Sequence, residues 1–171
     1  MMAENVMQAI GVEKVTLNIG AGEAGEKLEK AKKLLEKLTK KTPVYTLART
    51  RNPTFGIRKG MKIGVKVTLR DEAAIAFLEK GFGAVRKRLS GRAFDRNGNF
   101  AFGIHEYIDF PGMKYDPGIG LLGLDICVTL SRAGRRVKVR RKKFSSIGKR
   151  QLVTADEARA FVAEKFGVTI E

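Results

Sequence analysis

The sequence is poor in the residues that build disulfides and most metal sites. It has no tryptophan, one cysteine (Cys127) and one histidine (His105). A single cysteine excludes an internal disulfide, and one cysteine with one histidine cannot supply the ligands of a structural zinc site. No arrangement of serine, cysteine or aspartate suggests a nucleophile for His105, so we interpret it as an ordinary exposed residue of a strand. We therefore expect no enzyme, no cofactor and no bound metal.

Long hydrophobic runs are also missing. No stretch approaches the roughly 20 apolar residues that span a bilayer, and the first residues lack the basic and apolar regions of a signal peptide. We therefore expect no membrane partner and no secretory leader. Hydrophobic residues make up 43% of the 171-residue chain, which suffices for one globular core at this length. We interpret residues 1–171 as a single domain.

Acidic residues are absent from two stretches of the chain. Residues 48–70 contain seven Lys and Arg, and residues 131–150 contain ten, with no Asp or Glu in either. The rest of the chain carries 17 basic and 18 acidic residues, so the whole net charge of +16 comes from these two stretches. Such self-repulsion indicates a polyanionic partner, although two solvated charge runs, or a general affinity for anionic surfaces, would give the same composition.

The first basic stretch combines a loop with a strand. Residues 62–70 alternate between apolar side chains and basic or small ones, which is typical of a strand with one buried face. The preceding loop, at about 49–62, contains Pro53, Gly56 and Gly60 as breakers, and Phe55 as its only aromatic residue. We expect this loop to protrude, with Phe55 either contacting RNA or buried in the core.

The remaining elements follow from periodicity and turn signals. We expect further strands at 13–19, 44–47, 124–130 and 136–140, a hairpin arm at 94–104, and helices at 26–40, at 71–89 with Asp71 as N-cap, and from the Thr154–Glu157 capping box to Gly167. Residues 109–120 are rich in Gly and Pro and predict a long functional loop. Strands outnumber helices without regular alternation, which favours an α+β fold: a mostly antiparallel sheet with helices on one face and the other face open.

One motif favours a different function. Gly20, Gly22 and Gly25 fit the G-x-G-x-x-G pattern between a strand and a helix, as in dinucleotide-binding enzymes. The acidic residue expected about 20 positions later is missing, but Arg49 could meet a 2′-phosphate, which leaves an NADP-binding oxidoreductase as the alternative. Against it, Glu23 would lie beside the pyrophosphate, and no repeated strand–helix–strand series follows.

A nucleic-acid interface accounts for more of the sequence. The outward positions of the predicted strands are residues that can donate hydrogen bonds to phosphate or ribose oxygens: Lys14, Thr16, Asn18, Lys62, Lys66, Thr68 and Arg70. The second basic stretch adds Arg136, Lys138 and Arg140 to the expected RNA contacts. Outward aromatic residues are scarce, so the surface suits a folded RNA read by shape and backbone rather than by base stacking.

Several segments resemble one family over nearly the whole chain. They are KVTLNIGAGE at 14–23, LTKKTPVYTLART at 38–50, FGIRKGMKIGVKVTLR at 55–70, FDRNGNFAFGI at 94–104 and IDFPGMKYDPGIGLLGLDICVTL at 108–130. Together they are similar to large-subunit ribosomal protein five, the family that binds 5S rRNA. The tail RRKKFSSIGKRQLVT and the helix after it resemble the archaeal members.

The resemblance implies a structural protein of the cytoplasmic ribosome. It implies that the sheet holds 5S rRNA and large-subunit rRNA in the central protuberance, beside neighbouring large-subunit proteins. Asn18, Lys41, Phe55 and Thr68 fall where the family contacts 5S rRNA. The loop at 49–62, with Arg49, Arg51, Arg58 and Lys59, would reach the P-site tRNA, and residues 109–120 would contribute to a bridge with a small-subunit head protein.

Overall fold

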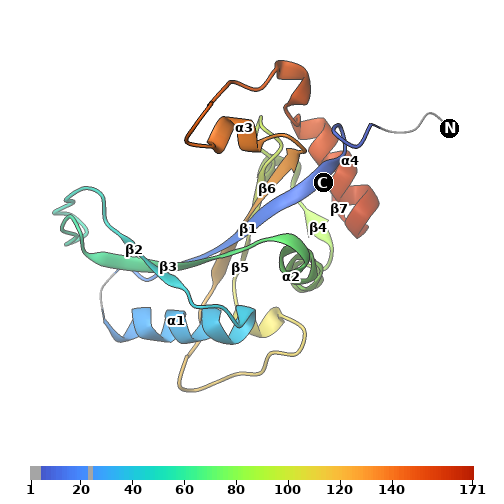
Figure 1. Cartoon of the computed structure of the whole chain (residues 1–171). Coiled ribbons are helices and arrows are strands. Elements are labelled where there is room, and N and C mark those ends of the chain that lie inside the picture. Colours follow the sequence, from blue (N-terminus) through green and yellow to red (C-terminus); the bar gives the residue numbers. More distant parts are fainter. Residues whose placement is uncertain (1–4, 23–24) are drawn as a thin grey trace.

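The computed structural model describes residues 5–22 and 25–171, and an antiparallel sheet lies at its centre (Figure 1). Its five strands run in the order β2-β3-β1-β6-β5. Their bounds are Ile10–Gly20 for β1, Val44–Leu47 for β2, Lys62–Leu69 for β3, Phe100–Ile104 for β5 and Leu124–Arg132 for β6. Two short strands, β4 (Arg88–Leu89) and β7 (Thr169–Ile170), form a separate parallel pair. The predicted α+β class is confirmed.

The alternation in β3 gives the sheet two different faces. Val65, Val67 and Leu69 are at most 5% exposed, whereas Lys66 and Thr68 between them are exposed. β1 repeats the pattern, because Val15, Leu17 and Ile19 are buried and the residues between them are only half-buried. Burial of one row of branched side chains therefore fixes which residues the other row presents to solvent.

The two long helices α1 and α2 cover the apolar face beneath the long strands. α1 (Glu26–Thr39) packs against β3 and α2 (Asp71–Ala84) against β1, and both lie below the sheet in Figure 1. α1 contributes Leu28, Ala31 and two further leucines to the core. α4 (Ala155–Phe166) lies at the right-hand end, and α3 (Arg136–Val139) stands above that end of the sheet. Over β2 and β3 the upper face carries no helix of the described chain.

The second helix is shorter than the sequence predicts. We expected it over 71–89, but it ends at Ala84, and the chain turns through Arg86 and Lys87, which have φ angles of 53° and 55°. Leu89 then enters the core in β4 instead, paired with Ile170. That partner lies far along the chain, so no local pattern could indicate the turn. Asp71 is also not the N-cap; Arg70 takes that position and Asp71 is the first helical residue.

The strand predicted at 136–140 is wrong. Gly134, with a φ of 92°, turns the chain after β6, and residues 136–139 form the single helical turn α3. The alternating valines mislead because Val139 is 70% exposed, so no buried face requires a strand there. Five alternating residues without a neighbouring strand carry little structural information.

The turn and cap signals give the expected structures. Asp95 Oδ1 accepts the N–H groups of Asn97 and Asn99, both at 2.8 Å, in the turn before β5. Thr154 and Glu157 form the predicted capping box at the start of α4. Short polar side chains thus fix both boundaries locally.

Candidate nucleic-acid interface

The uncovered face of the sheet, here called the open face, brings most of the predicted RNA-contacting residues together. In the pairing of β1 with β3, Asn18 lies opposite Lys66 and Thr16 lies opposite Thr68. Lys66, Thr68 and Arg70 are exposed, while Lys14, Thr16 and Asn18 are half-buried. Two adjacent rows therefore combine an ammonium, an amide and two hydroxyl groups. These groups can donate to phosphate and ribose oxygens without any large rearrangement.

The other half of the open face has a different character from the one we expected. Its outward positions are Ala101 and Gly103 on β5, and Asp125 and Cys127 on β6. The pKa of the Cys127 thiol is raised, first by burial and then by the nearby Asp125 carboxylate. The basic character is therefore confined to the β3 and β1 half. Alternation within 124–130 could have identified Asp125, but only the strand order places it beside Asn18.

The loop between β2 and β3 extends away from the rest of the protein, to the left in Figure 1. Asn52 and Ile57 exchange two backbone hydrogen bonds, of 2.9 and 3.0 Å, so the tip is itself an ordered turn. At this tip Phe55 is 71% exposed, which removes the core role that we considered for it. The predicted tRNA-contacting residues Arg49, Arg51, Arg58 and Lys59 are all exposed along the same loop.

The second basic stretch is tied to the domain at both ends. Arg132 Nη2 lies 2.7 Å from Glu157 Oε1, and its Nη1 donates to the carbonyl of Arg150 at 2.7 Å. Arg135 forms an ion pair with Glu13 of β1. The pKa of Glu157 is lowered, first by the backbone N–H of Thr154 and also by Arg132. These contacts hold a mostly exposed segment in place.

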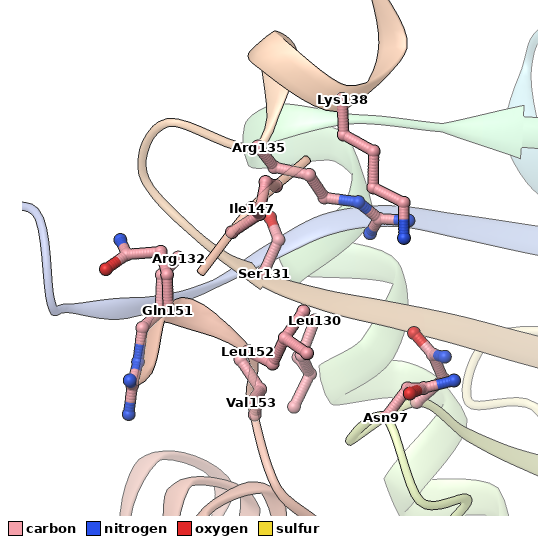
Figure 2. Close-up of a pocket in the computed structure, with 11 residues that line it drawn as sticks. Asn97, Leu130, Ser131, Arg132, Arg135, Lys138, Ile147, Gln151, Leu152 and Val153 are labelled. Carbon is pink, nitrogen blue, oxygen red and sulfur yellow. The ribbon is translucent and has the colours of Figure 1, made fainter. Parts of the chain in front are cut away.

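A small cavity marks where this segment meets the sheet. Its volume is about 170 Å³, and its lining includes Asn97, Arg135 and Lys138, as Figure 2 shows. The side chains of Arg136, Lys138 and Arg140 are all exposed nearby. The structure therefore presents a second basic surface, separate from the pair of rows on β3 and β1.

The long loop predicted at 109–120 is irregular and fixed to α1. Lys37 Nζ lies 2.6 Å from Asp116 Oδ2, and the buried Tyr107 hydroxyl accepts the N–H of Asp116 at 2.8 Å. The pKa of Asp116 is lowered, chiefly by the hydrogen bond from Lys37 and also by the N–H of Gly118. In Figure 1 the loop passes below the sheet, beside α1. It is therefore a positioned loop, on the side away from the open face.

Two further predicted residues lie outside the two donor rows and the second basic stretch. Lys41 is exposed in the link between α1 and β2, where its N–H donates to Thr39 Oγ1 at 3.3 Å. His105 is exposed just after β5, as expected. Within residues 5–22 and 25–171, no group of three or more His, Cys, Asp or Glu could hold a metal ion. No helix in the same ranges is long and apolar enough to cross a membrane.

The dinucleotide alternative is wrong. The strand before Gly20 pairs antiparallel with both of its neighbours, β3 and β6. A dinucleotide-binding fold needs a parallel sheet at this point, with the cofactor at the carboxyl ends of its strands. Gly22 has a φ of 73°, so the glycine serves a turn between β1 and α1. Glu23 lies outside the described residues.

Comparisons with known proteins give consistent results. Residues 5–58 match the family described as "Ribosomal protein L5", and residues 62–165 match the description of the C-terminal part of the same ribosomal protein family. A protein of Sulfolobus acidocaldarius named "Large ribosomal subunit protein uL5" is 50% identical over 167 residues, which cover 98% of this chain and 94% of that protein. Proteins of the same name from Methanococcus maripaludis and Pyrobaculum aerophilum are 51% and 49% identical, covering 93% and 96% of this chain and 90% and 92% of theirs.

Proposed function

Because the chain belongs to the ribosomal protein L5 family, in its archaeal form, and is a structural RNA-binding constituent of the large ribosomal subunit rather than an enzyme, we propose that its open face binds 5S rRNA. One observation carries this proposal: Lys66, Asn18, Thr68 and Thr16 form two neighbouring rows on the face of the sheet opposite α1 and α2. Donors spaced along adjacent strands match the repeated oxygens of an RNA backbone.

The other surfaces are assigned to further partners. The exposed Arg136, Lys138 and Arg140 bind large-subunit rRNA, while Lys41 and Phe55 add contacts to 5S rRNA from outside the sheet. The loop at 49–62 reaches the P-site tRNA through its arginines and Lys59. Residues 109–120, held by Lys37, face a protein of the small-subunit head. The exposure of Phe55 and of the basic side chains named here supports their assignments.

We treat residues 1–171 as one RNA-binding domain, although two family descriptions divide the chain. β1 and β2 lie within the first matched segment, and β3, β5 and β6 lie within the second. All five belong to one sheet, in which β1 sits between β3 and β6. Neither segment alone could therefore form the open face.

The test is a direct binding measurement with labelled 5S rRNA. Lys66→Glu should weaken binding about tenfold or more, because a charged hydrogen bond to phosphate is replaced by repulsion. Lys27→Glu, an equal charge change at an exposed position on α1, is the control and should bind normally. Wild-type protein should also prefer 5S rRNA over an unrelated structured RNA and over heparin. Equal binding to all three, or equal loss in both variants, would leave only a general anion surface.

A further inference from the structure

Asp125 is an unexpected residue on a face that binds RNA. No other acidic residue occupies an outward position of β3, β5 or β6. It lies in the middle of one row, opposite Asn18 of β1 on one side and Gly103 of β5 on the other. Lys66 belongs to the same row beyond Asn18. A carboxylate at this position would contact the same RNA that the two donor rows bind.

Nothing in the described chain neutralises this carboxylate. It takes part in none of the ion pairs or side-chain hydrogen bonds among residues 5–22 and 25–171. Lys66 is two strand spacings away, roughly 10 Å between the backbones, and its ammonium forms no ion pair with Asp125. An uncompensated negative charge beside a phosphate-binding row weakens RNA binding unless it accepts hydrogen bonds from the RNA itself.

The surface around Asp125 is hollow. Asn18, Gly20, Gly103, His105 and Asp125 contribute to an open hollow of about 570 Å³. A Cβ atom on Gly103 would lie 3.6 Å from Asp125 Oδ1, so the carboxylate rests beside a residue with no side chain. The small residues leave room for a flat group next to two polar ones.

We propose that Asp125 reads the Watson–Crick edge of an unpaired guanine in the bound RNA. Guanine is the only base that presents two adjacent donors, N1–H and the N2 amino group, which match the two oxygens of a carboxylate. In adenine and cytosine the amino group lies next to an acceptor nitrogen, and in uracil N3–H lies between two carbonyl groups, so each of these edges repels a carboxylate. Asn18, opposite Asp125, can bond the sugar or phosphate of the same nucleotide. This inference rests on the proposed function and adds a specificity determinant to it.

The experiment combines affinity with inosine interference. Inosine lacks the N2 amino group, so 5S rRNA transcripts with scattered inosine are sorted by binding, and positions depleted from the bound fraction are mapped. Wild-type protein should exclude inosine at one unpaired guanosine. Asp125→Asn should lose that exclusion and bind about five- to a hundredfold more weakly, the range for one bidentate base contact. Glu164→Gln, on the exposed side of α4, removes the same charge away from the open face and should change neither.

The sign of the effect decides the matter. If Asp125 were only a misplaced charge, or bound a cationic protein instead, Asp125→Asn would bind RNA as well as wild type or better, with an unchanged inosine map. Either result overturns the inference while 5S binding stands. If wild-type protein shows no preference for 5S rRNA, the proposed function fails, and the same map is then made on the large-subunit rRNA fragment that the protein does bind. Because Asp125 is exposed, Asp125→Asn should melt at the same temperature as the wild-type protein, and this measurement verifies that the variant is folded.

Discussion

Gly98 is the residue at which the turn before β5 meets the start of the terminal helix. Its φ is 74°, and a Cβ atom there would lie 2.6 Å from Val153 Cγ1 and 3.2 Å from the carbonyl oxygen of Thr154. Gly112 has a similar φ of 87° but nothing within 4 Å. Substitution of Gly112 therefore introduces backbone strain alone, whereas substitution of Gly98 introduces backbone strain and a steric clash.

We predict that Gly98→Ala destabilises the protein by about 2–5 kcal/mol, from about 1–2 for the left-handed backbone and about 1–3 for overpacking. Gly112→Ala should cost only the first contribution, about 1–2 kcal/mol. Urea unfolding of both variants gives the comparison. Equal losses would mean that Val153 moves aside freely and that α4 is loosely attached.

For single residues, the sequence predicts whether a side chain points inward or outward better than it predicts which residues lie beside it. Alternation alone places Lys66 and Thr68 outward, because the valines between them must be buried. That Asn18 faces Lys66 on one side and Asp125 on the other follows from strand order and register. These are set by packing between distant segments, so Asp125 was not among the predicted site residues.

Among the elements, the protruding loop between β2 and β3 should have a function that mutation can distinguish from that of the sheet. Arg58 is exposed on this loop, and the tip is closed by its own backbone hydrogen bonds. We predict that Arg58→Glu leaves 5S rRNA binding within about twofold of wild type. On the assembled ribosome it should weaken tRNA binding in the P site about tenfold, through loss of one charged contact.

The matched variant for this experiment is Lys66→Glu, which should weaken the binding of the isolated protein to 5S rRNA. Filter binding measures the first interaction and P-site tRNA dissociation measures the second. If Arg58→Glu abolished 5S binding and left tRNA unaffected, the loop would belong to the 5S interface.

The loop at 109–120 offers an element-scale test with a defined pH dependence. Lys37→Met should increase amide exchange of Gly118 and Gly120 a few-fold at neutral pH, because both N–H groups are bonded to Asp116. The pKa of Asp116 is lowered mainly by Lys37, so the contribution of this ion pair is complete above the ordinary value of 3.8. It is lost as the pH falls through the lower pKa of the folded state.

The ratio of exchange rates between variant and wild type should therefore stay constant from neutral pH to about 4 and approach one below the lowered pKa. Lys27→Met, at the other end of α1, is the control and should leave these amides unchanged. A ratio of one at every pH would show that Tyr107 alone holds the loop.

Helices and strands were predictable where hydrophobic periodicity and capping residues agree. They were not predictable where pairing with a distant segment determines the structure. α1, β3 and α4 have amphipathic patterns or a capping box, and each lies close to its predicted bounds. The end of α2 depends on pairing between β4 and β7, which joins residues near 88 to the C-terminal residues. The turn α3 shows the reverse case, a strand-like pattern with no strand to pair with.

At the scale of the whole molecule, the charge is divided between two surfaces rather than spread evenly. The protruding loop with the adjoining half of the open face holds one part of the excess and the segment at 131–150 holds the other, while α1 and α2 carry mixed charges. A rigid polyanion that contacts both surfaces would neutralise about six phosphates. The logarithm of the binding constant should then fall with the logarithm of salt concentration with a slope of about −4 to −5.

Removing three charges from one surface tests whether both surfaces contact the same RNA. We predict that replacing Arg136, Lys138 and Arg140 together by Ala makes the slope on a 5S and large-subunit rRNA complex shallower by about 2–3, because each lost phosphate contact contributes about 0.7–0.9. Replacing Lys27, Lys33 and Lys80, which are exposed on α1 and α2, removes the same charge and should leave the slope unchanged. Only contacts that release counterions alter the slope, so this comparison separates phosphate binding from net charge. Equal slopes for all three proteins would mean that the second basic surface never meets RNA, and the binding site would then reduce to the open face and the loop beside it.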